Sequence, residues 1–325
     1  MDQLRALRVF ARVVAEGSFA GAARALDMAP AVVTRTVAEL EEHLGARLLN
    51  RTTRRLALTE IGEAYLDLTR RILADLDDAD ALAGASTARP RGSLRVLSPP
   101  AFAVHQIAKH LPRFRALYPQ VSLEIAMPGP VDMADENFDV SIVSIGQQPL
   151  QGEFIARRLA CSTFLICAAP AYLDRRGRPE HPDALLQHDG LLPAVSAVRR
   201  ELTLYRHATP DDTGSPASVV TLPTPPPALS TSHIDMIRAA AIAGLGIAGL
   251  PSFVVEDDLR DGRLERVLPQ WRGGKLTLYA AMPTRKHVPA RTRAFVDYLV
   301  QTFGGTDNDP WLPVTASSRP SSLRS

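Results

Sequence analysis

Residues 18–59, SFAGAARALDMAPAVVTRTVAELEEHLGARLLNRTTRRLALT, decide the fold of the amino-terminal part of the chain. Gly17-Ser18 predicts that a helix begins near residue 19 and runs to about residue 26, because a serine oxygen can accept a backbone N–H left unpaired in the first turn. Pro30 suits the first position of a second helix, where no N–H is required. Residues 27–29 are short enough to be the turn between two helices, which predicts a helix-turn-helix.

The second helix is predicted to be amphipathic. Its apolar residues recur at helical spacing and form an inward stripe of Val33, Val37, Leu40 and Leu44. The opposite face carries short or hydrogen-bonding residues, namely Ala31, Thr34, Arg35, Ala38 and Glu39. A DNA major groove about 12 Å wide admits such a helix, and Arg or Thr side chains can reach base edges or phosphates. The outer face is therefore a candidate recognition surface, and Gly45 ends the helix.

A basic segment follows the second helix. Residues 47–55 hold four arginines and no acid, and the apolar residues at 48–49 and 56–58 can pair as a two-stranded wing with residues 51–54 at its tip. Arginine and hydroxyl side chains bind phosphates, and an arginine can enter a narrow minor groove. The candidate DNA-binding residues are Ser18, Ala31, Thr34, Arg35, Arg51, Thr52, Thr53 and Arg54.

Residues 1–88 resemble the winged helix-turn-helix and linker helix of the LysR-type transcriptional regulators. The matching residues are Phe10, Ser18-Phe19, Ala22-Ala23, Leu26, Val33, Thr34-Arg35, Val37, Leu40-Glu41, Leu44-Gly45, Leu48-Leu49, Arg51, Leu58-Thr59 and Gly62. The resemblance implies binding to double-stranded DNA. In the family, polar residues usually open the recognition helix, whereas this chain has Ala29-Pro30-Ala31, so Thr34 and Arg35 are expected to carry more of the recognition. On pattern alone, a helical core with a solvated charged face explains the motif equally well.

Residues 59–88 predict a long linker helix. Its apolar residues nearly follow a heptad register, with Asp75 interrupting one seam position. The candidate dimerisation residues are Ile61, Tyr65, Leu68, Ile72 and Leu82. Packing of this stripe against its own domain is the alternative. The family resemblance implies a homodimer that assembles into a tetramer, with two recognition helices on two half-sites of one operator.

Composition limits the other function classes. The 325 residues carry a net charge of only +2, so affinity for DNA must come from local clusters such as residues 47–55. Two cysteines, Cys161 and Cys167, imply no disulfide framework. The first residues are predicted to form an amphipathic helix and not a signal peptide, and the longest apolar run, residues 239–250, is too short for a predicted membrane span. We therefore expect a cytoplasmic protein with no membrane partner.

From residue 93 the pattern changes to α/β. Strands are predicted at 94–97, 121–125 and 139–143 with a helix at 105–118, and the chain crosses into a second lobe near residue 158. The second lobe is predicted to contain a strand at 163–168, a helix at 171–176, a proline-interrupted segment at 209–228, a helix at 234–243 and a strand at 246–250. The chain then returns through a strand at 275–280 and a helix at 290–303. Two lobes with two crossovers are typical of the periplasmic-binding-protein fold.

Residues 92–303 resemble the effector-binding half of the same family. The resemblance rests on Gly92-Ser93-Leu94-Arg95-Val96, Leu111-Pro112-Arg113-Phe114, Tyr118-Pro119, Phe138-Asp139-Val140, the run at 239–251 and the final helix. The expected fold is multidomain, combining α+β and α/β parts. Its divisions are a winged helix-turn-helix (1–58), a linker helix (59–88), an effector-binding domain (92–303) with lobe I at about 92–160 and 268–303 and lobe II at about 161–267, and a disordered tail (304–325). Residues 83–92, rich in small residues and broken by proline and glycine, form the predicted hinge.

The interlobe cleft is the default site for a small-molecule effector. Ligands in α/β sheets bind beyond the carboxyl ends of strands, near helix N-termini. This rule selects Ser98, Pro99, Pro100, Ala101, Ser144, Ile145, Gly146, Ser230, Thr231 and Ser232. For any one residue, an ordinary helix cap is an equally good explanation. The prolines supply few N–H donors, so a weakly polar or aromatic effector is an alternative to a carboxylate.

Other chemistry finds little support in the sequence. Residues 244–249 match G-x-G-x-x-G, but a helix precedes them and a strand follows, the reverse of a dinucleotide site. The cysteines are interpreted as buried apolar residues, with redox sensing as the alternative. We expect no catalytic set, metal or cofactor. The predicted function is effector-controlled operator binding, with RNA polymerase as a further candidate partner; the alternative is a ligand-binding α/β protein whose amino-terminal unit serves assembly only.

Overall fold

The structure, a computed structural model, describes residues 1–51, 56–83, 90–146, 152, 154–194, 201–207, 216–283 and 288–312. The chain forms two compact units, Met1–Gly92 and Ser93–Ser325, which are described separately below. Within the described residues, no helix combines the length and the apolar character required to cross a membrane. The predicted hinge falls largely on residues 84–89, which lie outside the described residues.

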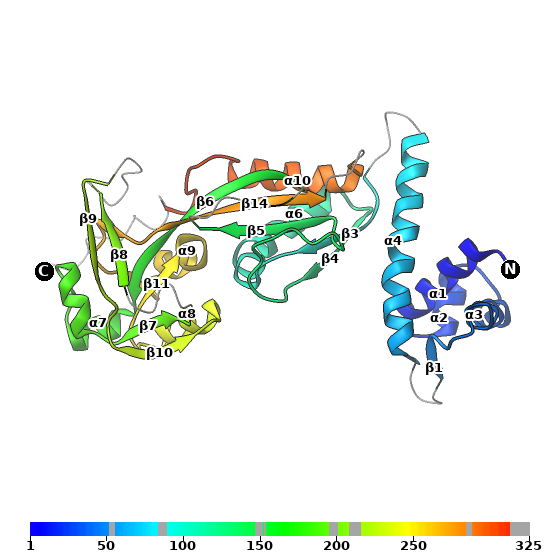
Figure 1. The fold of residues 1–325 in the computed structure, drawn as a ribbon, viewed down its shortest axis with the longest axis horizontal. Helices are drawn as coiled ribbons and strands as arrows, with labels where there is room; N and C mark the ends of the chain where they lie inside the picture. The colour runs from blue at the N-terminus through cyan, green and yellow to red at the C-terminus, as the bar shows by residue number, and fades with distance from the viewer. Residues whose placement is uncertain are drawn as a thin grey trace, which may run out of the picture. The chain divides into compact units, whose positions relative to one another are not determined.

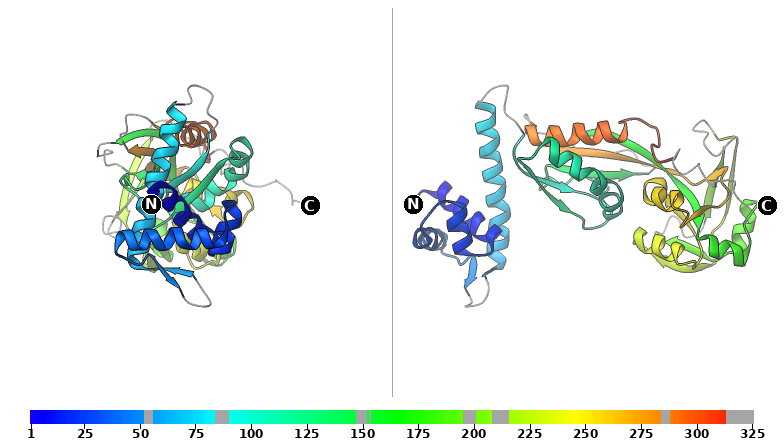
Figure 2. Two further views of the ribbon diagram at one scale, coloured as in Figure 1. Left: turned by 90° about the vertical axis from the view of Figure 1, so that its right-hand side faces the viewer. Right: turned by 180° about the vertical axis from the view of Figure 1, so that it is seen from behind.

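The amino-terminal unit is a winged helix-turn-helix followed by one long helix (Figures 1 and 2). Its elements are α1 (Gln3–Glu16), α2 (Phe19–Ala25), α3 (Pro30–Leu44), β1 (Leu49–Arg51), β2 (Leu56–Leu58) and α4 (Glu60–Ala83). As predicted, Ser18 caps α2, with its Oγ accepting the Gly21 N–H at 3.0 Å. Gly45 ends α3 in the left-handed region at φ 64°. The predicted wing is present as an antiparallel pair, β1 with β2.

The base of the wing is fixed by hydrogen bonds to α3 and α4. A carboxylate oxygen of Glu41 accepts the N–H groups of Leu48 and Leu49 at 2.8 and 3.0 Å. The Leu48 carbonyl oxygen accepts the Thr59 N–H at 3.0 Å, and Thr59 Oγ1 accepts the Gly62 N–H at 2.9 Å. These bonds satisfy backbone groups at a strand end and at a helix start, which would otherwise be left unpaired. The orientation of the wing relative to α3 is therefore set by the chain itself.

The carboxyl-terminal unit is built on a nine-stranded mixed sheet whose strand order is β10-β7-β11-β6-β14-β5-β3-β4, with β12 also paired to β6. The strands are β3 (Gly92–Leu97), β4 (Val121–Ala126), β5 (Val140–Ile145), β6 (Phe154–Ala168), β7 (Gly190–Pro193), β10 (Pro227–Thr231), β11 (Ile247–Pro251), β12 (Glu265–Arg266) and β14 (Lys275–Pro283). A separate three-stranded sheet, in the order β13-β8-β9, contains β8 (Glu201–Arg206), β9 (Ser218–Pro223) and β13 (Trp271–Arg272).

Two long strands connect two lobes. β6 and β14 pair antiparallel over Phe154–Thr163, and β6 continues beyond this point to pair with β11 from Phe164 onward (Figure 1). Lobe I contains β3, β4 and β5, and lobe II contains β7, β10 and β11. The helical segments are α5 (Pro100–Phe102), the π-helix η1 (Ala103–Ile107), α6 (Ala108–Leu117), α7 (Pro170–Arg176), the 3₁₀ helix η2 (Pro182–Gln187), α8 (Ile234–Ile242), α9 (Ser252–Arg260) and α10 (Ala290–Phe303).

The structure corrects three predictions for this unit. The predicted helix at 105–118 is α6 preceded by the π-helix η1, in which the hydrogen bonds are one residue longer. The predicted strand at 163–168 is only the end of the fifteen-residue strand β6. The prediction of a disordered tail from residue 304 is wrong for residues 304–312, because Trp311 and Leu312 are 4% and 2% exposed. Residues 313–325 of the predicted tail lie outside the described residues.

Candidate DNA-binding surface and effector site

The outer face of α3 is exposed, as its sequence predicts. Val33, Val37 and Leu40 are fully buried, which turns Ala31, Arg35 and Ala38 to the surface and leaves Thr34 half-buried. This small, largely uncharged face allows close approach to another surface, and Arg35 supplies its cation. The structure therefore places three of the predicted DNA-binding residues, Ala31, Thr34 and Arg35, on one helix face.

Two of these side chains have local partners. The Arg35 Nε lies 3.4 Å from a carboxylate oxygen of Glu39, and the Arg35 side chain is 74% exposed. Thr34 Oγ1 donates to the Pro30 carbonyl oxygen at 3.0 Å. An exposed ion pair of this kind contributes little and is easily exchanged for a phosphate. Ala29 at the N-cap of α3 makes no side-chain hydrogen bond to the first turn.

The remaining DNA-binding candidates lie around this face. Ser18 is exposed, and its oxygen accepts the Gly21 N–H as the cap of α2. Arg51 ends β1, at the base of the predicted tip. The tip candidates Thr52, Thr53 and Arg54 lie outside the described residues.

The apolar stripe predicted along α4 divides into two parts. Ile61, Leu68 and Ile72 are 57%, 51% and 51% exposed and share one helix face at spacings of seven and four. Tyr65 instead packs on the helix-turn-helix core, with its ring 6.0 Å from that of Phe10, and burial raises the pKa of its hydroxyl. The alternative of packing within the domain thus applies to Tyr65. The side chain of Leu82 lies outside the described residues.

The effector candidates of lobe I occupy neighbouring strands at different levels. β3 and β5 are parallel, with Leu97 level with Ser141, so Ser144–Gly146 lie about 10–17 Å past the end of β3 at roughly 3.3 Å per residue. Ser98 is fully buried, and its hydroxyl donates to the Pro99 carbonyl oxygen at 3.2 Å. Ala101 is buried, whereas Pro99, Pro100, Ser144 and Ile145 are half-buried and Gly146 is exposed. The structure therefore does not bring this set together as one cluster of hydroxyls.

A cross-lobe hydrogen bond brings other candidates together. His105 Nε2 of η1 lies 2.7 Å from Asp235 Oδ1 in the first turn of α8. The bond holds the N-terminal turn of α8, preceded by Ser230–Ser232, beside the segment that follows Pro99–Ala101. Thr231 Oγ1 accepts the His233 N–H at 3.2 Å and is thus used locally, whereas Ser230 and Ser232 are exposed. Sequence reasoning missed His105 and Asp235, because no local pattern pairs residues 130 positions apart.

Two cavities lie outside the predicted effector set. A cavity of about 480 Å³ at the end of β3 is lined by Leu97 and by the segment between β4 and β5, at Pro128 and 130–137. The Pro-Gly-Pro sequence at 128–130 is the signal that could have identified this irregular segment. Another cavity, of about 500 Å³, lies where α6, α9, α10 and the segment after α10 meet, and Gln106, Lys109, Glu256 and Trp311 are among its lining residues.

The remaining sequence motifs have structural roles. In the G-x-G-x-x-G run, α8 precedes and β11 follows, as predicted, and a Cβ on Gly246 would lie 2.2 Å from the Asp189 carbonyl oxygen. Close backbone approach thus explains that glycine. Both cysteines are buried and free, and burial raises the pKa of the Cys167 thiol to about 12. At neutral pH this thiol stays protonated and is a poor nucleophile.

A helix-turn-helix with a wing, a long helix and a two-lobed α/β domain together define a class of DNA-binding regulators. Residues 4–63 match the family described as "Bacterial regulatory helix-turn-helix protein, lysR family", and residues 87–304 match the "LysR substrate binding domain". An uncharacterised HTH-type transcriptional regulator of Haemophilus influenzae is 32% identical over 292 residues, 90% of this chain and 97% of that relative.

Solved structures agree with these matches. The LysR-type regulator CrgA of Neisseria meningitidis is 31% identical, with a TM-score of 0.55 over 92% of this chain and 98% of CrgA. The full-length virulence activator AphB of Vibrio cholerae is 26% identical, with a TM-score of 0.55 over 92% of this chain and 99% of AphB. The chain belongs to the LysR family of transcriptional regulators and combines the helix-turn-helix and effector-binding domains of that family.

Proposed function

We propose that this regulator reads its operator through the outer face of α3, with Arg35 and Thr34 as the principal side chains and the wing on the flanking phosphates. The observation that carries the proposal is the division of α3 into a buried Val33-Val37-Leu40 stripe and an exposed face with one arginine. A helix buried on one side and exposed on the other can enter a major groove without unfolding its domain. In this proposal the protein acts in the cytoplasm, without enzymatic activity of its own.

Arg35→Ala is expected to weaken binding to DNA from upstream of the protein's own gene by about 10- to 100-fold, because one arginine contact to a base or phosphate is lost. Fluorescence anisotropy across a salt series measures both the affinity and the number of phosphate contacts. Arg12→Ala is the matched control, since Arg12 forms the equivalent exposed pair with Glu16 on α1, at 2.9 Å. If Arg35→Ala and Arg12→Ala bind this DNA with equal affinity while dimerisation is intact, the result would favour the alternative that the amino-terminal unit serves assembly only.

We also propose that the exposed stripe Ile61, Leu68 and Ile72 pairs with the same stripe of a second copy, and that such dimers assemble into a tetramer. Three large apolar side chains on one helix face are more than half exposed, and their contact with water is unfavourable. A self-complementary interface with a second copy would bury them and so be stabilised. A dimer presents two copies of α3 to two half-sites. RNA polymerase is the further partner that we propose at the promoter.

Leu68→Glu is expected to weaken dimerisation roughly 100-fold or more, because each dimer loses two buried leucines and gains two facing carboxylates. Light scattering during size-exclusion chromatography, over a dilution series, reports the mass. Glu63→Lys changes a charge on the opposite face of α4 and should leave the mass unchanged. A dimer that persists in Leu68→Glu at the same concentrations would place the interface elsewhere.

The effector proposal is limited to the segments that the lobes bring together. We propose that a small molecule binds between Pro99–Ala101 of lobe I and Ser230–Ser232 of lobe II, beside the His105–Asp235 hydrogen bond. Two prolines at the start of α5 remove N–H donors from this site, which favours a weakly polar or aromatic effector over a carboxylate. A ligand that contacts both lobes would bias their arrangement and, through it, the paired DNA-binding units.

A further inference from the structure

The segment after α10 makes contacts that neither the sequence nor the family match explains. α10 ends at Phe303, Gly304 caps it at φ 96°, and the LysR substrate binding domain match stops at residue 304. Residues 305–312, here called the strap, nevertheless contain the buried residues Asp309, Trp311 and Leu312. Three of the eight residues of this segment are therefore buried, although the segment lies beyond the matched domain.

The strap runs along the part of β6 that connects the lobes. The Gly305 N–H donates to the Leu159 carbonyl oxygen at 2.9 Å, and the Cys161 N–H donates to the Asn308 carbonyl oxygen at 3.1 Å. One edge of β6 pairs with β14 here, while on the other edge β11 begins only at Phe164. The strap therefore covers the stretch of edge that β11 leaves open.

Asp309 connects this edge to lobe II. Its carboxylate accepts the Thr163 N–H at 2.8 Å and the Ser252 hydroxyl at 2.8–2.9 Å, and Ser252 is the first residue of α9. Ser252 and Asp309 are 0% and 8% exposed. Burial raises the pKa of the Asp309 carboxyl, against the opposing effect of these hydrogen bonds. A buried acid with its acceptors satisfied holds its partners in one geometry.

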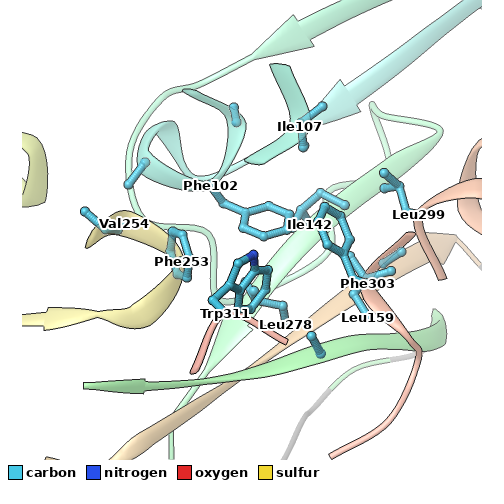
Figure 3. Packing of buried hydrophobic residues seen from close by; sticks show 14 of the residues in the cluster. Phe102, Ile107, Ile142, Leu159, Phe253, Val254, Leu278, Leu299, Phe303 and Trp311 are labelled. Carbon is cyan, nitrogen blue, oxygen red and sulfur yellow. The ribbon is translucent and has the colours of Figure 1, made fainter. Parts of the chain in front are cut away.

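Trp311 connects the strap to both lobes (Figure 3). Its ring centroid lies 6.3 Å from that of Phe102 in α5 and 5.7 Å from that of Phe253 in α9. Its Nε1–H donates to Gln106 Oε1 of η1 at 2.9 Å, and Gln106 Nε2 donates to the Phe253 carbonyl oxygen at 2.7 Å. Phe102 and Gln106 belong to lobe I, whereas Phe253 belongs to lobe II, so the indole bridges them.

A change in lobe arrangement must therefore disturb the strap. Rotation of lobe II about β6 and β14 moves Ser252 and Phe253 relative to Gln106, while Asp309 and Trp311 are separated by only one residue. The strap cannot follow both lobes at once without losing the carboxylate bonds or the indole bond. The contacts of the strap thus stabilise one lobe arrangement more than the others. Such a difference in stabilisation is what biases a conformational equilibrium.

We propose that the strap is a built-in restraint on the crossover strands, which holds the two lobes in their resting arrangement and which an effector must overcome. Asp309 and Trp311 are its positioning residues. The inference rests on the proposed function only for its effect on DNA; the restraint itself is a property of the effector-binding domain.

The test measures the distance between lobes in the full chain without DNA or ligand. Spin labels at Ser122→Cys in β4 and Ser218→Cys in β9, both exposed positions, report the distance by pulsed electron resonance, with unlabelled protein added to remove intersubunit signals. All variants carry Cys161→Ser, because Cys161 Sγ lies 3.8 Å from an Asp307 carboxylate oxygen and loss of the strap would uncover it. Trp311→Ala and truncation after Gly304 are expected to shift the distance by several ångströms or to broaden its distribution.

Two controls separate this effect from general destabilisation. Truncation after Leu312 keeps the strap and should reproduce the wild-type distribution. Trp311→Phe keeps an aromatic ring but removes the N–H, and should give an intermediate distribution. In Asp309→Asn, hydrogen exchange of the Thr163 amide should accelerate about 10-fold or more, since the carboxyl group that accepts its N–H is replaced by an amide. Unchanged distances in folded Trp311→Ala protein would overturn the proposal, whether or not the truncated chain folds.

DNA binding is measured separately on the same variants. If the restraint and the proposed function both hold, Trp311→Ala changes the affinity for upstream DNA together with the interlobe distance. A changed distance with unchanged DNA affinity would retain the restraint and count against its coupling to DNA. The interlobe distance therefore tests the restraint, and the DNA affinity separately tests its coupling to the proposed function.

Discussion

Gly62→Ala is expected to abolish DNA binding while leaving the carboxyl-terminal unit folded. Alanine normally stabilises a helix by about 0.5–1 kcal/mol relative to glycine, and Gly62 lies in the first turn of α4. Here, however, a Cβ would lie 2.0 Å from the Leu48 carbonyl oxygen and 2.9 Å from its carbon. The expected sign is therefore reversed, with a net destabilisation of the amino-terminal unit of about 2–3 kcal/mol.

Relief of this clash requires a movement that breaks other contacts. Leu48 is held on both sides, because Glu41 accepts its N–H and its carbonyl oxygen accepts the Thr59 N–H. Moving Leu48 away from α4 would break the bonds that fix the wing. Moving α4 instead would separate Leu66, which is buried, from the helix-turn-helix core. Either movement disturbs the surface that α3 and the wing present to DNA.

The chain itself provides separate readouts. Both tryptophans, Trp271 and Trp311, lie in the carboxyl-terminal unit, so their fluorescence during urea denaturation follows that unit alone. Anisotropy with labelled upstream DNA follows the amino-terminal unit. Gly249→Ala is the matched control, since a Cβ there meets nothing within 4 Å. Wild-type DNA affinity in Gly62→Ala would show that the wing does not need its present position.

The helix-turn-helix was predictable from sequence because its determinants are local. The serine cap of α2, the proline at the start of α3, the 3.6-residue periodicity of Val33, Val37 and Leu40, and the glycine after Leu44 all act within a few residues. Each signal agreed with the others, which is the condition under which local patterns specify a structure. The same holds for α10, whose predicted and observed bounds are identical.

The strap and the effector site were less predictable, because their determinants are distant in sequence. The polar residues at 304–309 indicate a loop, and the burial of Trp311 depends on Gln106, 205 positions away. The register of β5 against β3, which separates Ser144 from Ser98, depends on strand pairing that no local pattern encodes. β8 and β9 were missed for a similar reason, since they pair with each other and β8 also pairs with the distant Trp271.

The second large effect is expected at Asp258, a fully buried carboxylate in α9. Its carboxylate oxygens accept hydrogen bonds from Nε and Nη2 of Arg238 in α8, at 2.6 and 2.7 Å. Nη2 of Arg263 lies 2.9 Å from one of the same carboxylate oxygens. The bidentate pair connects two helices of lobe II through one carboxylate that has no exposed surface. Asp258→Ala would leave the guanidinium of Arg238, whose side chain is 21% exposed, without its carboxylate partner.

Removing one partner of a buried ion pair costs about 3–5 kcal/mol, because the remaining charge stays desolvated. Asp258→Ala should therefore lower the free energy of unfolding of the carboxyl-terminal unit by that amount, measured by tryptophan fluorescence in urea. Asp261→Ala is the control, since Asp261 is 48% exposed and pairs with Arg260 and Arg263 at the surface. Its cost should stay within about 1 kcal/mol.

Two further measurements test whether buried charge is the cause. The loss in Asp258→Ala should persist in 1 M salt, where the screening length is about 3 Å and exposed pairs no longer contribute. The double variant Arg238→Met with Asp258→Leu should recover most of the loss, because an apolar pair of similar volume removes the stranded charge, while the half-exposed Arg263 can turn to solvent. A double variant as unstable as Asp258→Ala would instead show that the hydrogen-bond geometry between α8 and α9 holds lobe II together.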